Sequence, residues 1–243
     1  MAVTFDDEPV ALFLAEAEAV ELTLNYIAQL DELADLVGLA VRDIFENMSR
    51  VDRADIARFV RQASPFAEAG AAEGADLAAA YLSELTGSAI GAVDLTMPVI
   101  RYDDPFLRTW HQLSEGYEYE AARESGSSVA EMMGRDAPRD GASSRMSQPG
   151  TKVRGWRRVI SAKACEWCRV VGTQLYKSQK SATFGHHGCR CEVVAVPFGP
   201  DPGKAINDRR LRELKASGAV ERVSAARERS RGREREALLA LFA

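Results

Sequence analysis

The feature that most constrains the fold is a cluster of cysteines and histidines in the C-terminal half of the chain. The 243-residue sequence places all of its cysteines within residues 165–191, at Cys165, Cys168, Cys189 and Cys191. Two of its three histidines, His186 and His187, fall in the same stretch. The pattern reads C-x2-C, an interval with strand character, and then H-H-x-C-x-C. Such spacing predicts that the segment closes around a single centre.

Zinc is the metal that this pattern suits best. The C-x2-C turn of Cys165 and Cys168 points two thiolates at one ion, and a second group of ligands normally follows some 12–20 residues later. The predicted ligands are therefore Cys165, Cys168, His186, Cys189 and Cys191. His187 is a further candidate, so which residues fill the four positions of a tetrahedral site stays open. Because soft ligands are plentiful, we expect a closed, structural zinc rather than a catalytic one.

The plainer alternative for these cysteines is burial in a core without a metal. The N-terminus is acidic and lacks the apolar region of a secretory signal, so we expect synthesis in a reducing cytoplasm, where clustered thiols bind metals more often than they form disulfides. The longest apolar runs are far shorter than the roughly 18 residues that a membrane span needs. We therefore expect no membrane partner.

Charge is distributed unevenly along the sequence. Residues 1–150 carry 27 Asp and Glu against 11 Lys and Arg, whereas residues 151–243 carry 9 against 20. This division indicates two functional regions, and the basic one could meet an acidic partner or nucleic acid. The alternative is that the charges neutralise each other or solvate helix faces.

Apolar periodicity predicts that the N-terminal part is nearly all helix. One helix is expected over 8–47, a second that ends at Pro65, and a third over 73–87 with Gly87 as its C-cap. The stretch rich in Ser, Gly, Pro and Asp that begins at Asp136 predicts a linker. Short β-branched and aromatic segments after it favour strands around residues 153–161, 174–177 and 191–198, and a charged helical pattern closes the chain.

The expected fold class is thus α+β, mostly α. We predict an acidic all-helical domain over residues 1–135, a linker over 136–153, a small zinc-stapled α+β module over 154–199 and a charged, basic helical tail over 200–243.

The cysteine cluster also has features of an HNH-type nuclease. In that interpretation His187 activates water, and Asn207 with a later histidine completes the site. No histidine follows His187, however, and no second C-x2-C follows the first. We therefore assign no catalytic residue and expect no enzyme activity, with a metal-dependent nuclease and a zinc-dependent DNA-binding protein as the alternatives.

A Trp followed by C-x2-C, a strand and then F-x-H-x-x-C-R-C resembles the signature of the phage Mu protein F-like family. These are minor head proteins of tailed bacteriophages, including capsid-maturation-associated proteins of actinophages. The matching residues here are Phe184, His186, Cys189, Arg190 and Cys191, with Gly185 inserted and His187 where the family often has Pro. The specific match covers about residues 154–197.

The resemblance implies a virion protein of the phage head, made in the bacterial cytoplasm and present in multiple copies. Its implied partners are the portal protein, the major capsid protein or both, and its implied role is head morphogenesis or DNA delivery. The basic C-terminal region could lie against packaged DNA without sequence preference, and Arg154, Arg157 and Arg158 are the predicted nucleic-acid contacts. For the arginines of residues 227–235 we favour a solvated helix face.

Overall fold

The computed structural model describes residues 14–48, 53–88, 119–147, 153–161, 166–178 and 191–216. Within these ranges the protein is mostly helical with a small antiparallel sheet, which confirms the expected α+β class with helix predominating. The elements are α1 (Glu16–Glu46), α2 (Arg53–Thr86), α4 (Tyr119–Met146), β1 (Gly155–Val159), α5 (Glu166–Val171), β2 (Glu192–Val196) and α7 (Pro202–Ala216).

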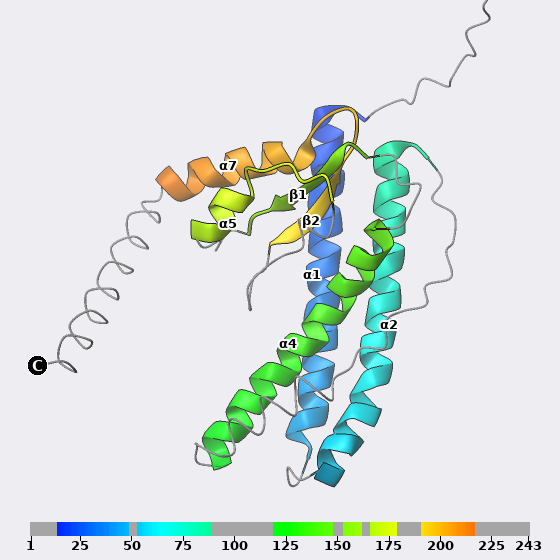
Figure 1. Ribbon diagram of the computed structural model, residues 1–243, viewed down its shortest axis with the longest axis vertical. Coiled ribbons are helices and arrows are strands. Elements are labelled where there is room, and N and C mark those ends of the chain that lie inside the picture. Colours follow the sequence, from blue (N-terminus) through cyan, green and yellow to red (C-terminus); the bar gives the residue numbers. More distant parts are fainter. Residues whose placement is uncertain are drawn as a thin grey trace, which may run out of the picture.

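The long helices α1, α2 and α4 pack against one another as an elongated bundle (Figure 1). The buried face of α1 recurs every three or four residues, from Ala19 through Leu30 to Phe45, and this is the periodicity that predicted the helix. At the end of α2, Gly87 adopts φ 61°, the left-handed conformation of a helix C-cap. Both expectations are confirmed over the described residues.

Helix α2 corrects the expectation that one helix ends at Pro65 and another begins near residue 73. It runs unbroken from Arg53 to Thr86 with Pro65 inside it. Pro65 is exposed, so the backbone carbonyl that loses its partner to the proline ring lies on the water-facing side. Buried alanines on both sides of it, at Ala63 and Ala67, keep the helix packed on its neighbours. Tertiary packing here outweighs a local helix breaker.

The predicted linker is also wrong over its first eleven residues, because 136–146 form the last part of α4. The small residues that suggested a loop are buried against the other helices. A Cβ atom on Gly141 would lie 1.9 Å from the carbonyl oxygen of Ala71, and one on Gly74 would lie 2.1 Å from that of Pro138. Small side chains therefore serve close helix contact here rather than a turn.

Strands β1 and β2 pair antiparallel, with Gly155 opposite Val196 and Val159 opposite Glu192. This confirms the strands predicted around 153–161 and 191–198. The strand predicted near 174–177 is reduced to an isolated bridge between Tyr176 and Trp156, whose backbone N–H groups each donate to the other's carbonyl at 2.8 Å.

We use the term module for β1, α5, β2 and α7, which lie together beside one end of the bundle (Figure 1). Helix α7 packs on both strands and on α1, and its Ile206 is fully buried. A single core joins the module to the bundle through Tyr26, Leu82, Trp156 and Val194. The first part of the predicted tail therefore packs as part of the module.

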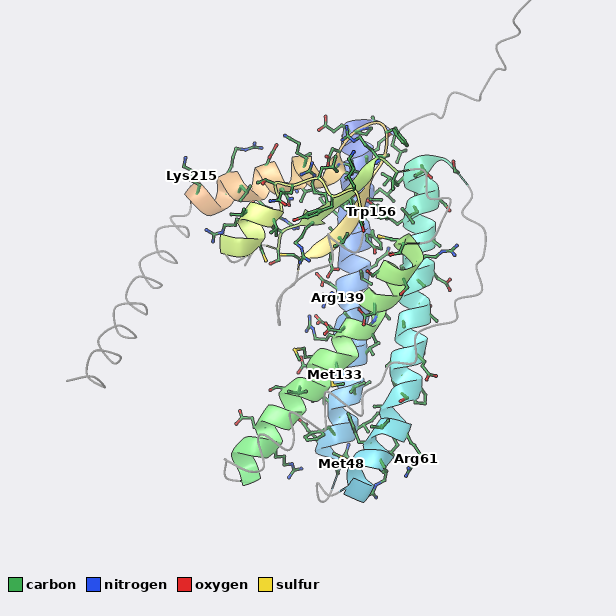
Figure 2. The ribbon with its side chains drawn as sticks, viewed as in Figure 1. Met48, Arg61, Met133, Arg139, Trp156 and Lys215 are labelled. Atoms are coloured by element: carbon green, nitrogen blue, oxygen red, sulfur yellow. The ribbon has the colours of Figure 1, made fainter. Side chains whose placement is uncertain are left out.

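A second core cluster lies in the other half of the bundle, around Val41, Phe45 and Phe59. The rings of Phe45 and Phe59 meet edge to face with centroids 5.8 Å apart. Figure 2 shows Trp156 and Arg139 toward the module end and Met48 at the opposite end. The bundle is thus longer than the part of it that the module covers.

Candidate metal centre

The structure brings together the two predicted zinc ligands that it describes. Cys168 lies on α5 and Cys191 lies directly before β2, and both are buried, with exposed fractions of 1% and 8%. With Ile160 they form one small cluster, against which Leu211 of α7 packs. One member of the C-x2-C pair and the last cysteine of the motif therefore belong to the same buried cluster.

The other predicted ligands, Cys165, His186 and Cys189, lie outside the described residues, as does His187. Among the residues that are described, no three His, Cys, Asp or Glu side chains gather as a metal site requires. The ligand set remains a prediction for these positions.

Helix α5 holds Cys168 against the end of β1. The helix ends at Val171, and the N–H of the next residue, Gly172, donates to the carbonyl of Cys168 at 2.8 Å. A Cβ atom on Gly172 would lie 2.5 Å from Cγ2 of Ile160, so only glycine permits this approach. The C-terminal turn of α5 and the residue after β1 are therefore pressed directly together.

The surroundings of Cys191 favour negative charge on its sulfur. The backbone N–H of Ser161 donates to Cys191 Sγ at 3.3 Å. The guanidinium of Arg210, which donates to the carbonyl of Ile160, interacts electrostatically with Cys191. Burial lowers the pKa of Arg210, neighbouring Arg209 lowers it further, and Cys191 opposes both effects. Hydrogen bonds and positive charge near a sulfur support the thiolate that a metal needs.

Asn207 on α7 links the segments around the two cysteines. It is 2% exposed, and its Nδ2 donates to the carbonyls of Arg158 and Gly172, each at 2.8 Å. Its Oδ1 accepts the N–H of Ile160 at 2.9 Å. One side chain thus satisfies three buried backbone groups from two separate segments.

Asp201 forms a second anchor at the start of α7. Its carboxylate accepts the N–H of Lys204 at 2.8 Å, which caps the helix, and it pairs with Arg157 at 2.7 Å. Arg157 also donates to the carbonyls of Thr173 and Gln174 at 2.9 and 3.2 Å. The aspartate followed by proline is a helix-start signal in the sequence, whereas nothing in the sequence marks Asn207 or Arg210 as anchors.

The arginines predicted to contact nucleic acid are mostly internal. Arg157 and Arg158 are 5% and 3% exposed, and Arg157 is committed to Asp201. Only Arg154 is substantially exposed, and it lies 3.5 Å from Asp201. Because Arg157 is buried and paired with Asp201, its guanidinium is not available to a phosphate in this conformation. Arg158 is buried as well, and the nucleic-acid contact stays a prediction. The arginines of residues 227–235 lie outside the described residues.

Arg139 of α4 connects the bundle to the strand that begins beside Cys191. Its guanidinium lies 2.5 Å from Glu192 of β2 and 2.5 Å from Asp31 of α1. Figure 2 shows Arg139 on α4, between Trp156 and Met133 along the bundle. Glu192 is buried, so this guanidinium supplies the counter-charge that a buried carboxylate needs.

Comparison of the chain with models of known protein families, with curated proteins and with solved structures finds no match. Among the described helices, none is both long enough and apolar enough to cross a membrane.

Proposed function

We propose that the protein is a minor head protein of a tailed bacteriophage whose module is held together by a structural zinc ion. The observation that carries the proposal is the motif of residues 165–191 together with the burial of Cys168 and Cys191 in one cluster. Cysteines 23 positions apart in the sequence reach the same cluster, as a zinc site built from both halves of the motif requires.

The donors around this cluster suit zinc. Cys168 and Cys191 would supply two thiolates, and Cys165, His186 and Cys189 are the predicted remaining ligands. The Ser161 N–H bond to Cys191 Sγ is the kind of outer-shell contact that orients a metal-bound thiolate. A bound zinc ion would cross-link the module, whose two strands have only five residues each.

The polar residues near the cysteines support assembly rather than catalysis. Glu192, the acid next to Cys191, is buried and committed to an ion pair with Arg139. Asn207, the residue that a nuclease would need, uses its side-chain amide to hydrogen-bond three backbone groups. These contacts favour the structural role over the nuclease alternative.

The proposed partners are the portal protein, the major capsid protein or both. The bundle provides long helical surfaces for such contacts, and its acidic character differs from the basic C-terminal part of the chain. Packaged DNA remains a proposed non-specific partner of that basic part through residues beyond Arg157 and Arg158.

The location of the protein tests this proposal. An antibody against the chain is used to follow it through gradient-purified phage particles and through DNA-free heads from the same bacterial lysate. We expect the chain in both, in multiple copies and at a constant ratio to the capsid protein. Recovery only in the soluble fraction would overturn the proposal.

Activity on DNA tests the nuclease alternative separately. Supercoiled plasmid incubated with the purified full chain and Mg²⁺, Mn²⁺ or Zn²⁺ should remain supercoiled. Nicking that is lost on His187→Ala would replace the structural proposal with the nuclease.

A further inference from the structure

We infer that Asn207 is a positioning residue for the metal centre, although it lies outside the cysteine and histidine motif. Its amide aligns the segment that supports Cys191 with the helix that carries Cys168. This inference rests on the proposed zinc site and adds to it the residue that sets the relative position of two of its thiolates.

The first half of the link leads from Asn207 to Cys191. Asn207 Oδ1 accepts the N–H of Ile160 at 2.9 Å, and the next residue, Ser161, donates its own N–H to Cys191 Sγ at 3.3 Å. The side chain of Ile160 packs in the same cluster as both cysteines. A shift of this backbone segment therefore moves the hydrogen-bond donor of the Cys191 sulfur.

The second half leads from Asn207 to Cys168. Asn207 Nδ2 donates to the carbonyl of Gly172 at 2.8 Å, and the N–H of Gly172 donates to the carbonyl of Cys168 at 2.8 Å. A Cβ atom on Gly172 would lie 3.2 Å from Asn207 Nδ2, so the contact has no slack. The position of the last turn of α5 thus depends directly on the Asn207 amide.

The remaining amide proton of Asn207 holds the side chain to β1. It goes to the carbonyl of Arg158 at 2.8 Å, within β1. With the strand and the helix end held by one buried planar group, their separation is set by the size of an amide. A tetrahedral zinc site needs its thiolates at defined positions, and outer-shell residues that fix them typically change metal affinity about 10–100-fold when removed.

Asp201 provides a matched control on the same helix. Like Asn207, it is a largely buried polar residue that bonds to β1 and to a backbone N–H. Its own hydrogen bonds reach neither the segment beside Cys191 nor Gly172. Asp201→Ala should therefore destabilise the module without redirecting the thiolates.

The test is a titration of the full chain with Co²⁺, whose absorption reports the ligand geometry, followed by Zn²⁺ competition against a chromophoric chelator. We expect Asn207→Ala to weaken Zn²⁺ binding about 10–100-fold and to shift the Co²⁺ bands. Asn207→Ser, which keeps one polar group, should show a smaller shift of the Co²⁺ bands. It replaces the alanine variant in the test if that variant does not fold. Asp201→Ala should keep the wild-type bands and an affinity within about threefold, although its melting temperature falls.

Wild-type bands and affinity in both Asn207 variants would overturn the inference while leaving the zinc site intact. Equal losses in the Asp201 and Asn207 variants would also overturn it, because general destabilisation would then explain both. A wild-type chain that gives no thiolate-to-cobalt bands removes the zinc site itself, and the role of Asn207 with it.

Discussion

The bundle and the module are held together in different ways. In the bundle, backbone meets backbone through small residues, as at Gly141 against Ala71. In the module, side chains of α7 reach across to backbone groups of neighbouring segments, as Asn207 does. The contact between α2 and α4 therefore depends on the absence of side-chain volume, whereas the module depends on satisfied polar groups and, in our proposal, on a metal. Arg139 crosses from the bundle to β2.

Removal of the metal should produce the largest difference in stability between the module and the bundle. Structural zinc contributes on the order of 10 kcal/mol in small domains, so we expect a strong chelator to open the module. Hydrogen exchange should then rise sharply in β1 and β2 and little around Phe45 and Phe59 in the far half of the bundle. Equal loss of protection in both regions, or none in either, would contradict the distinction.

Breaking the connection between the regions should have the next largest effect. Arg139→Ala leaves the carboxylate of Glu192 buried without its guanidinium, which we expect to lower the free energy of unfolding by about 3 kcal/mol in chemical denaturation. The double variant Arg139→Ala with Glu192→Gln should recover part of this loss, because the uncompensated charge is gone. If the single variant is as stable as the wild type, Arg139 is not the connection we describe.

A single added methyl group at a close contact between helices should lower the stability of the bundle. Gly141→Ala places a Cβ atom against the Ala71 carbonyl, which cannot rotate away, and we expect a loss of about 2 kcal/mol in urea unfolding. Gly70→Ala is the control, because its Cβ atom would meet Cγ2 of Val37, a side chain that can adjust. The gain in helix propensity of about 1 kcal/mol should nearly cancel that strain. Equal effects of the two substitutions would refute backbone contact as the cause.

The smallest effect at neutral pH concerns the buried tyrosines where bundle and module share a core. The rings of Tyr26 and Tyr81 stack with centroids 4.4 Å apart, and burial raises the pKa of both phenols. The negative charge of Glu192 raises the pKa of Tyr26 further. The folded state therefore keeps phenolic protons that the unfolded chain releases above a pH of about 10.

Stability from these two groups should be complete below pH 10 and fall as the pH rises beyond it. We expect each of Tyr26→Phe and Tyr81→Phe to reduce that fall by about 1 kcal/mol per pH unit, measured as urea midpoints between pH 9 and 11. Parallel pH profiles for the wild type and both variants would show that the phenols stay accessible to water.

Much of this architecture could be predicted from sequence, and the failures have a common cause. The apolar periodicity of the sequence was sufficient to predict α1, and the β-branched residues were sufficient to predict β1 and β2. Gly141, Pro138 and Pro65 misled because local propensity signals a break in the helix. Close packing between helices instead requires a small residue at Gly141, accommodates the buried Pro138 against Gly70 and Gly74 of α2, and tolerates Pro65 because it is exposed. Only the neighbouring helix distinguishes a loop glycine from a contact glycine.

The candidate site shows the same limit for polar residues. The spacing of the cysteines predicts that Cys168 and Cys191 share a metal centre. The structure shows them in one buried cluster, and the metal itself stays a prediction. Charge alone could not separate the buried Arg157 from a surface arginine, because its partner Asp201 is 44 positions away. The Asn207 contacts to β1 and α5 are equally non-local, so only the fold reveals them.

Elemental analysis of the natively purified full chain tests the central claim most directly. We expect about one equivalent of zinc per chain, retained through gel filtration and lost on treatment with a thiol-modifying reagent. Less than about half an equivalent of any transition metal in freshly purified protein would contradict it.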